Sequence, residues 1–341
     1  MDQKDSRKDG AFRTNIGGQA LIEGIMMRGP DKVAAVARRP DGTLAVQEQP
    51  YIPLKERNAL LGLPVVRGAA SLVVSLAVGM KTLMWAAEQV LEEETPEDAD
   101  SPPETPEPPE PRDPSAGAKT AKAKKSDTGL LVISLLLGLV LAVGLFTVLP
   151  TFLGGLIARW TGDGFLRNLL ETLLRVLILV GYMLAVSQMK DIKRVFAYHG
   201  AEHKTIACYE AGQPLTPENV KRFPRFHPRC GTSFLLMVLL VSLVAFMLVG
   251  LVLTRWVDLG HPLIRVATRL AILPFVAGIA YEINRFIGAH DNGFTRFLRA
   301  PGLWLQRITT KEPDGDMIAV GIDALSRVIP AKQADAEWGR E

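Results

Sequence analysis

Long apolar runs separated by polar segments dominate the second half of the chain. A helix that crosses a bilayer needs roughly 20 consecutive residues with few charges. Four runs of that kind follow position 128: Gly129–Ile157, Leu166–Ser187, Thr232–Thr254 and Pro262–Ile287. Glu171 and Arg175 interrupt the second run, four residues apart, so that they can pair on one helix face. The pattern predicts four transmembrane helices within residues 129–288, and we expect Pro150 to kink or end the first.

A fifth apolar run, Leu60–Ala87, is long enough to cross a membrane but contains Arg67 and Lys81. A full crossing here would also place either the N-terminal region or a later lysine cluster outside the cell. We therefore expect an interfacial or re-entrant helix within residues 58–91. A helix buried against the bundle is an equally good interpretation.

The N-terminal region, residues 10–57, has the pattern of a small β element. Two short strand-like runs in VAAVARRPDGTLAVQEQP are joined by Pro-Asp-Gly, whose residues favour a tight turn. This pattern predicts a β-hairpin on the cytoplasmic side.

Two further regions are polar. Residues 92–128 change from Glu, Pro and Asp to Ala and Lys, with almost no aliphatic side chains that could form a core. We expect a disordered linker, either a plain spacer or a tether whose lysines contact anionic headgroups. Residues 289–341 form a cytoplasmic tail with a short helix expected over Asp316–Ile329. The predicted fold is a mainly α polytopic membrane helix bundle with a small N-terminal β element.

The distribution of charge predicts the orientation in the membrane. The loop of residues 190–231 carries eight Lys and Arg residues, against Arg159 and Arg167 in the first hairpin. Positive loops stay in the cytoplasm, so we expect N-in and C-in topology in the bacterial cytoplasmic membrane. The net charge of +3 is too small to imply nucleic acid, and two cysteines provide no disulfide framework of a secreted protein. The lipid bilayer is the expected partner.

The same loop concentrates side chains that bind metals. His199, Glu202 and His203 match the pattern H-x-x-E-H, in which two histidines on one helix face share a metal and the glutamate is a possible general base. Gly200 weakens a helix here, and the pattern is short. The alternative is that the histidines form hydrogen bonds at the membrane surface.

His227 and Cys230 lie at the far end of the loop, directly before the third membrane helix. A helix N-terminus favours the thiolate of Cys230, the form that binds metal. Both ends of the loop are held at the same membrane face, so His199, His203, His227 and Cys230 can converge. Such a set of four ligands suits zinc.

Two neighbouring residues are weaker candidates. Glu210 follows His203 by seven residues, about 10 Å along a helix, which is too far for both to reach one ion. Cys208 lies among apolar and aromatic residues, which predicts a packed, inert thiol.

Four segments together closely resemble a bacterial and plastid membrane family, the domain of unknown function 1385 or YqhQ family. They are GGQALIEGIMMRGP from Gly17, YHGAEHKTIACYEAG, HPRCGTSFLL and PGLWLQRITTKEPD. The resemblance implies a polytopic membrane protein and a metal-dependent enzyme. It also implies that seven residues occupy the motif positions of the family: His199, Glu202, His203, His227, Cys230, Glu23 and Arg28.

Glu23 and Arg28 lie in a glycine-rich segment that lacks the spacing of a nucleotide-binding loop. Glu23 is a candidate metal ligand or base, and Arg28 a candidate clamp for a substrate carboxylate or phosphate. The alternative is a structural pair that docks the N-terminal region onto the bundle.

These observations lead to two hypotheses of different classes. The first is a membrane-embedded hydrolase in which His199, His203 and, in one version, His227 hold zinc while Glu202 takes the proton from water. That mechanism needs an open coordination position, so a shell closed by Cys230 would be structural. The second is a non-catalytic scaffold in which a metal or a hydrogen-bonded clasp orders the loop for a protein partner. The substrate of the first and the partner of the second are not identified by the sequence.

Overall fold

The computed structural model describes residues 12–91, 133–134, 136–161, 165–253, 256 and 261–337. The predicted linker, residues 92–128, lies outside them. The chain forms two compact units, one within Glu94–Ile178 and the other made of Met1–Glu93 and Leu179–Glu341.

The larger unit contains a four-stranded antiparallel sheet in the order β1-β2-β3-β4. Its strands are β1 (Gly17–Leu21), β2 (Gly24–Arg28), β3 (Lys32–Arg38) and β4 (Leu44–Pro50). The predicted hairpin is β3–β4: Gly42 adopts a φ of 87° in its turn, and the backbone N–H of Thr43 donates to Asp41. The β1–β2 hairpin was not predicted from the sequence. It turns at Glu23, a non-glycine residue with a φ of 50°.

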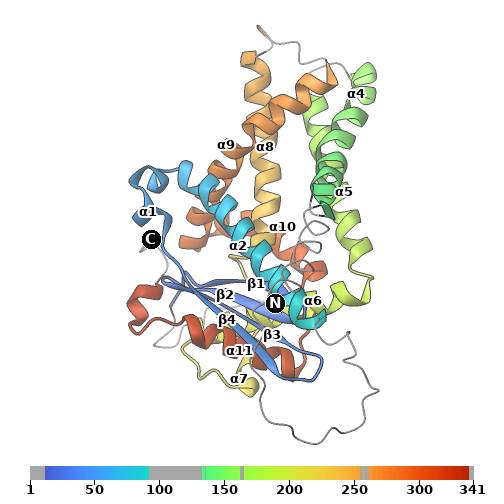
Figure 1. Cartoon of the computed structure of the whole chain (residues 1–341). Coiled ribbons are helices and arrows are strands. Elements are labelled where there is room, and N and C mark those ends of the chain that lie inside the picture. The colour runs from blue at the N-terminus through green and yellow to red at the C-terminus, as the bar shows by residue number, and fades with distance from the viewer. Residues whose placement is uncertain are drawn as a thin grey trace, which may run out of the picture. The chain divides into compact units, whose positions relative to one another are not determined.

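Both faces of the sheet are covered by helices (Figure 1). These helices are α2 (Val66–Leu91) on one face, and α6 (Lys190–Glu210) and α11 (Gly315–Val328) on the other. Because successive side chains in a strand point to opposite faces, Ile25 and Met27 pack with α6 and α11 while Met26 packs with α2. Burial on both faces explains why β2 and β3 are nearly continuous apolar runs.

The segment predicted as interfacial is a single continuous helix, α2, preceded by α1 (Leu54–Arg57) and η1 (Ala59–Gly62). Its first turn packs against α9 (Pro262–Ala289), where Arg67 pairs with Glu282. Its later turns lie on the sheet, and Lys81 donates to Gln49 of β4. The helix therefore bridges a candidate membrane helix and the sheet.

The remaining helices of the larger unit are α7 (Pro217–Lys221), α8 (Gly231–Leu253), α10 (Gly293–Thr309) and η4 (Gln333–Ala336). The predicted third and fourth membrane runs coincide with α8 and α9, and the predicted C-terminal helix with α11. The expected His/Cys loop is mostly helical, because α6 and α7 occupy much of it. Helix α10, which lies in the predicted polar tail, was not expected.

In the smaller unit, one apolar stretch of helix spans Leu136–Ile157. It contains the π-helical turn η3 (Gly144–Val148), which is followed directly by α4 (Leu149–Thr161). Of the two expected effects of Pro150, a kink or an end, the end does not occur, because the helix continues through it. The wider turn directly before it accommodates a residue that has no N–H to donate. In α5 (Phe165–Val186), Glu171 pairs with Arg175 as predicted, with 3.8 Å between the charged atoms.

Five described helices are long and apolar enough to cross a membrane: the four predicted spans and α2.

Candidate metal centre

The H-x-x-E-H segment lies in the middle of α6, on a stretch that is buried by the sheet, by α11 and by the segment after α10. His199 and His203 are one turn apart, and their ring centroids are separated by 4.3 Å. Gly200, which weakens a helix in isolation, is required here by close packing. A Cβ atom at Gly200 would lie 2.0 Å from the carbonyl oxygen of Lys311.

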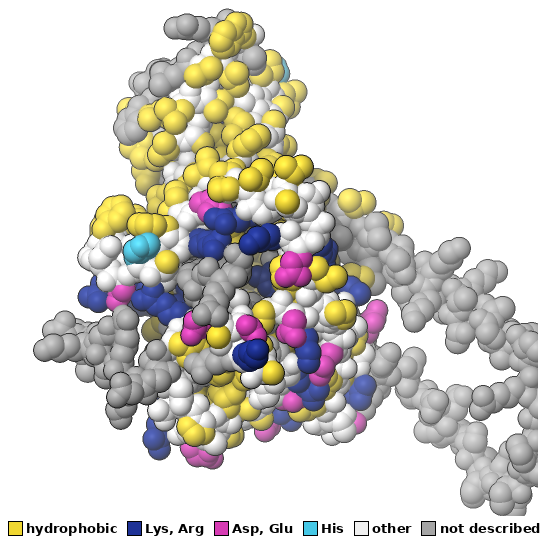
Figure 2. Space-filling model, turned by 90° about the vertical axis from the view of Figure 1, so that its left-hand side faces the viewer, with side chains coloured by type: hydrophobic (Ala, Val, Ile, Leu, Met, Phe, Trp, Pro, Cys, Tyr) yellow, Lys and Arg dark blue, Asp and Glu magenta, His cyan; other side chains and the backbone are white. Residues whose placement is uncertain are grey.

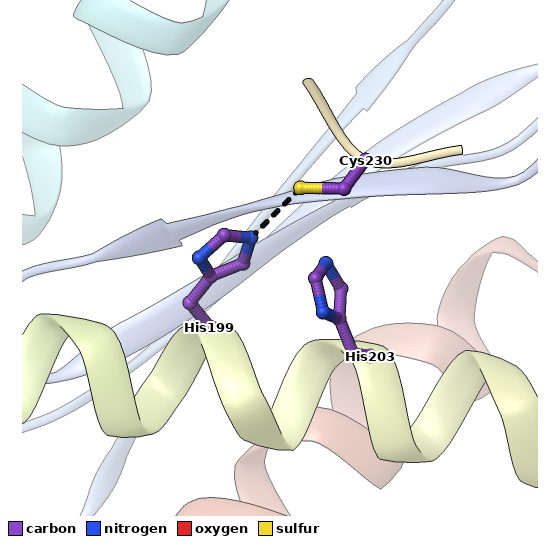
Figure 3. A group of neighbouring side chains, drawn as sticks. All are labelled: His199, His203 and Cys230. Carbon is purple, nitrogen blue, oxygen red and sulfur yellow. Dashed lines mark hydrogen bonds between the residues drawn. The ribbon is translucent and has the colours of Figure 1, made fainter. Parts of the chain in front are cut away.

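Cys230 approaches the two histidines from the residue directly before α8. Its Sγ atom lies 3.2 Å from Nε2 of His199. The ligand atoms of His199, His203 and Cys230 all lie within 4.8 Å of one another. Figure 3 shows both imidazole rings directed from α6 toward the sulfur. These three residues form the candidate metal centre of the described chain.

Backbone carbonyl groups orient both imidazole rings. Nδ1 of His199 lies 2.8 Å from the carbonyl oxygen of Thr309, and Nδ1 of His203 lies 2.6 Å from that of Arg225. Because a carbonyl oxygen can only accept, the hydrogen resides on Nδ1 in each ring. Each Nε2 therefore faces the centre, as is usual in metal-binding histidines. Sequence reasoning did not identify Thr309 or Arg225, because backbone acceptors have no side-chain signature.

His203 has an unusual buried atom. Its Nε2 has no hydrogen-bond partner among the described residues, although the side chain is almost fully buried. A buried nitrogen without a partner is costly unless another group satisfies it. A cation shared with Cys230 and His199 would do so.

The charges of the centre favour the thiolate of Cys230. Burial alone would raise the pKa of the Cys230 thiol, but its electrostatic interactions with the neighbouring imidazole rings, His199 first, hold that pKa well below its ordinary value. Burial likewise opposes the charged form of His199, yet the neighbouring Cys230 outweighs it and raises the pKa of His199 to about 9. The side chain of Cys230 is thus in the form that ligates metals, whereas a charged His199 must lose a proton before its Nε2 can bind one.

Glu202 lies beside the centre, directly under strand β1. It accepts a hydrogen bond from the backbone of Gly18, and a Cβ atom at Gly18 would lie only 2.9 Å from its Cδ atom. Burial raises the pKa of this carboxyl group, although the nearby histidines act in the opposite direction. A carboxylate with a raised pKa next to metal ligands has the character of a proton acceptor.

His227 does not join the group of three. Its ring centroid is 5.6 Å from that of His203, but its Nε2 lies 3.5 Å from Oε2 of Glu210. Burial lowers the pKa of His227, which keeps the ring neutral, so the positive partner of Glu210 is Arg229. Glu210, set aside as a ligand from the sequence, therefore takes part as the group that holds His227.

The two N-terminal candidates make contacts of another kind. Glu23 forms an ion pair with Arg194 of α6 and accepts a hydrogen bond from Tyr198, at 3.2 Å. Arg28 donates to Ser75 of α2 at 3.2 Å and lies over the ring of Tyr51. The two residues do not pair with each other. Their contacts dock the sheet onto α6 and α2, which favours the structural interpretation.

Cys208 is fully buried and packs with Val220 and Ile318. Burial raises the pKa of its thiol. This environment agrees with the prediction of an inert cysteine.

Comparison with known proteins reveals one family. A family model described as "Protein of unknown function (DUF1385)" matches residues 63–331. The uncharacterized protein YqhQ of Bacillus subtilis (strain 168) is 32% identical over 319 residues, which is 92% of each chain. No solved structure matches. The family match includes all three residues of the candidate metal centre.

Proposed function

This chain belongs to the DUF1385 family of proteins of unknown function, and we propose that it is a membrane-embedded, metal-dependent enzyme of the hydrolase class. His199, His203 and Cys230 would hold the ion. The observation that carries the proposal is the grouping of these three donors within 4.8 Å of one another while His227 is bound to Glu210.

The donor set suits zinc. Imidazole nitrogen and thiolate sulfur are the ligands that zinc prefers, and catalytic zinc sites use three protein ligands with one position open. The buried, unpartnered Nε2 of His203 and the carbonyl-bound Nδ1 atoms support this assignment. A fourth protein ligand would have closed the site, and His227 was the sequence-based candidate for that place.

A bound zinc-type ion supplies Lewis acidity, which lowers the pKa of water and polarises a carbonyl or phosphoryl oxygen. The residue of this chain that would accept the proton is Glu202, because its carboxyl group lies beside the donors. Gly18 holds that carboxyl group through its backbone N–H. The reaction class that follows is hydrolysis.

We place the centre at the cytoplasmic face of the bacterial membrane, with both termini inside. The polar region that carries the centre is rich in Lys and Arg, which favours the cytoplasmic side. The contact of α2 with the sheet supports four membrane crossings plus one interfacial helix, because its later turns pack on β-strands.

One observation favours a second function, a structural clasp. Glu202 is buried beneath β1, and His203 and Cys230 are buried as well. The centre thereby connects α6, the start of α8, the end of α10 and the sheet. In that case a metal would stabilise a scaffold for a protein partner and would catalyse no reaction.

Elemental analysis of the purified protein tests the metal. We expect about one zinc ion per chain, lost in a His199→Ala and His203→Ala double variant and in Cys230→Ser. Cys208→Ser is the matched control, because its thiol packs in an apolar cluster, and His227→Ala should also retain zinc. A wild-type protein without metal would contradict both functions.

Complementation of a deletion strain separates the two functions. Glu202→Gln keeps the size and the hydrogen-bond acceptor of the side chain but removes the proton acceptor. If the protein is an enzyme, this variant should bind zinc and fail to complement. Complementation by a zinc-loaded Glu202→Gln protein would establish the clasp.

A further inference from the structure

Helix α10 has an apolar face that no other described part of the larger unit covers. Three residues separate it from the end of α9, and it begins with a capping box formed by Asn292 and Thr295. Phe294, Phe297 and Trp304 are 65%, 75% and 51% exposed, respectively. Soluble helices seldom expose three large aromatic side chains, so this face needs an explanation.

The exposed aromatic residues form one stripe along the helix. Phe294, Phe297, Pro301 and Trp304 follow each other at intervals of three and four residues, which places them on a single side. The opposite side packs inward: Gly302 lies against Ser233 of α8, and Leu305 and Gln306 are buried. The helix therefore has one face committed to the protein and one turned outward.

Cationic side chains border the apolar stripe. Helix α10 carries three arginines, Arg296, Arg299 and Arg307. The short segment before it carries one acidic residue, Asp291. Asp291 pairs with the first two, and Arg307 is exposed. Figure 2 shows Lys and Arg side chains gathered at the border of a surface covered by hydrophobic side chains.

The position of α10 identifies the occupant of this surface. Helix α9 is a candidate membrane span that ends at Ala289, and α8, which packs against α10, begins at Gly231 as another. Phe286 near the end of α9 is likewise half exposed and contacts the ring of His290, in the segment that leads to α10. A helix with an aromatic stripe, a basic border and a place at the end of two spans has the features of an interfacial helix.

We propose that the stripe of Phe294, Phe297, Pro301 and Trp304 lies in the headgroup layer of the bilayer, and that Arg296 and Arg307 select anionic lipid there. Tryptophan is enriched at this depth because its ring is apolar and its N–H is polar. Each arginine near an anionic membrane surface strengthens binding to that surface about fivefold.

The test uses the full-length protein in lipid nanodiscs that contain phosphatidylcholine and phosphatidylglycerol. One of the two lipids carries bromine near the headgroup end of its chains, which quenches nearby tryptophan. Subtracting the spectrum of the Trp304→Phe variant isolates the signal of Trp304. We expect quenching by both brominated lipids, stronger by at least about twofold with phosphatidylglycerol, because the arginines attract its anionic headgroup.

An Arg296→Gln and Arg307→Gln double variant should lose the preference for phosphatidylglycerol and keep the quenching. Ser326→Trp is the control, because it places an indole on the exposed side of α11, which packs on the sheet, and its added signal should not be quenched. If neither brominated lipid quenches Trp304, the proposal that this face lies in the membrane is overturned, and a protein partner or a second copy covers it instead. Equal quenching by the two lipids would overturn the preference for anionic lipid.

Discussion

The carboxamide of Gln306 forms two hydrogen bonds with the backbone of His227. Oε1 of Gln306 accepts from the N–H of His227 and its Nε2 donates to the carbonyl oxygen, each at 2.8 Å. The same Nε2 also contacts Oγ of Ser233 at 3.3 Å. Helix α10 thereby fixes the segment that leads into Cys230, while the end of α10 accepts from His199.

Replacing Gln306 by Ala should destabilise the protein. The change leaves a buried N–H and a buried carbonyl group of His227 without partners, which costs about 2–3 kcal/mol in total. Zinc content should also fall, because Cys230 is then less well positioned. Thermal unfolding in detergent and elemental analysis measure the two effects. Arg307→Ala at the next, exposed position is the control, and equal effects of the two substitutions would contradict the argument.

Gly18 and Gly17 are neighbours in β1 and provide a matched pair. A Cβ atom at Gly18 would lie 2.8 Å from the carbonyl oxygen of Met26 and 2.9 Å from Cδ of Glu202, whereas one at Gly17 meets nothing within 4 Å. Gly18→Ala should therefore lower the free energy of unfolding by about 1–3 kcal/mol, because the added methyl group overpacks this site. Gly17→Ala should change the free energy of unfolding by no more than about 0.5 kcal/mol.

Under the enzyme hypothesis, Gly18→Ala should also reduce the function of the protein in cells more than its stability alone explains, because it displaces Glu202. Comparing complementation by the Gly18→Ala protein with that by a core variant of equal stability isolates this effect. Equal complementation by the two would mean that the position of Glu202 does not matter.

Gly200 tests whether close packing outweighs helix propensity. Alanine is favoured over glycine in a helix by about 1 kcal/mol. At Gly200 the added methyl group would lie 2.0 Å from the carbonyl oxygen of Lys311, so the backbone must move, at a cost of about 1–3 kcal/mol or more. Gly200→Ala should lower the unfolding temperature. Gly181→Ala, where the added methyl group meets no atom within 4 Å, should leave it unchanged or raise it.

Asp291 should make stability depend on pH. Hydrogen bonds from Arg296 and Arg299 outweigh burial and hold the pKa of its carboxyl group well below its ordinary value. A carboxylate whose pKa is depressed in the folded state stabilises the protein above its unfolded pKa of about 4, and that contribution is lost as the pH falls.

The free energy of unfolding of the wild type should therefore exceed that of Asp291→Asn by about 1 kcal/mol or less near neutral pH, as for other partly exposed ion pairs. This difference should shrink as the pH falls below about 4. Unfolding midpoints measured from neutral to acidic pH, at low and high salt, check this. A difference that stays constant across that range would show that the carboxylate charge plays no part.

Local patterns were sufficient to predict most elements of the fold. The four apolar runs, the Pro-Asp-Gly hairpin and the helix at 315–328 all depend on residues near one another in the chain, so their signals are local. The β1–β2 hairpin was missed because its turn contains Glu23 in place of glycine. Helix α10 was missed because Pro301 and its exposed aromatic residues obscure the helical pattern.

The candidate metal centre likewise combines a feature set by local sequence with features set by tertiary packing. The four-residue spacing of His199 and His203 is a property of any α-helix and was evident from the sequence. That Cys230 meets these histidines, while His227 turns to Glu210, depends on how α6, α8 and α10 pack together. Those two contacts join residues 31 and 17 positions apart, and their geometry comes from buried surfaces that local patterns do not encode. The sequence therefore named the chemistry available to this protein, and tertiary packing selected three donors from its four candidates.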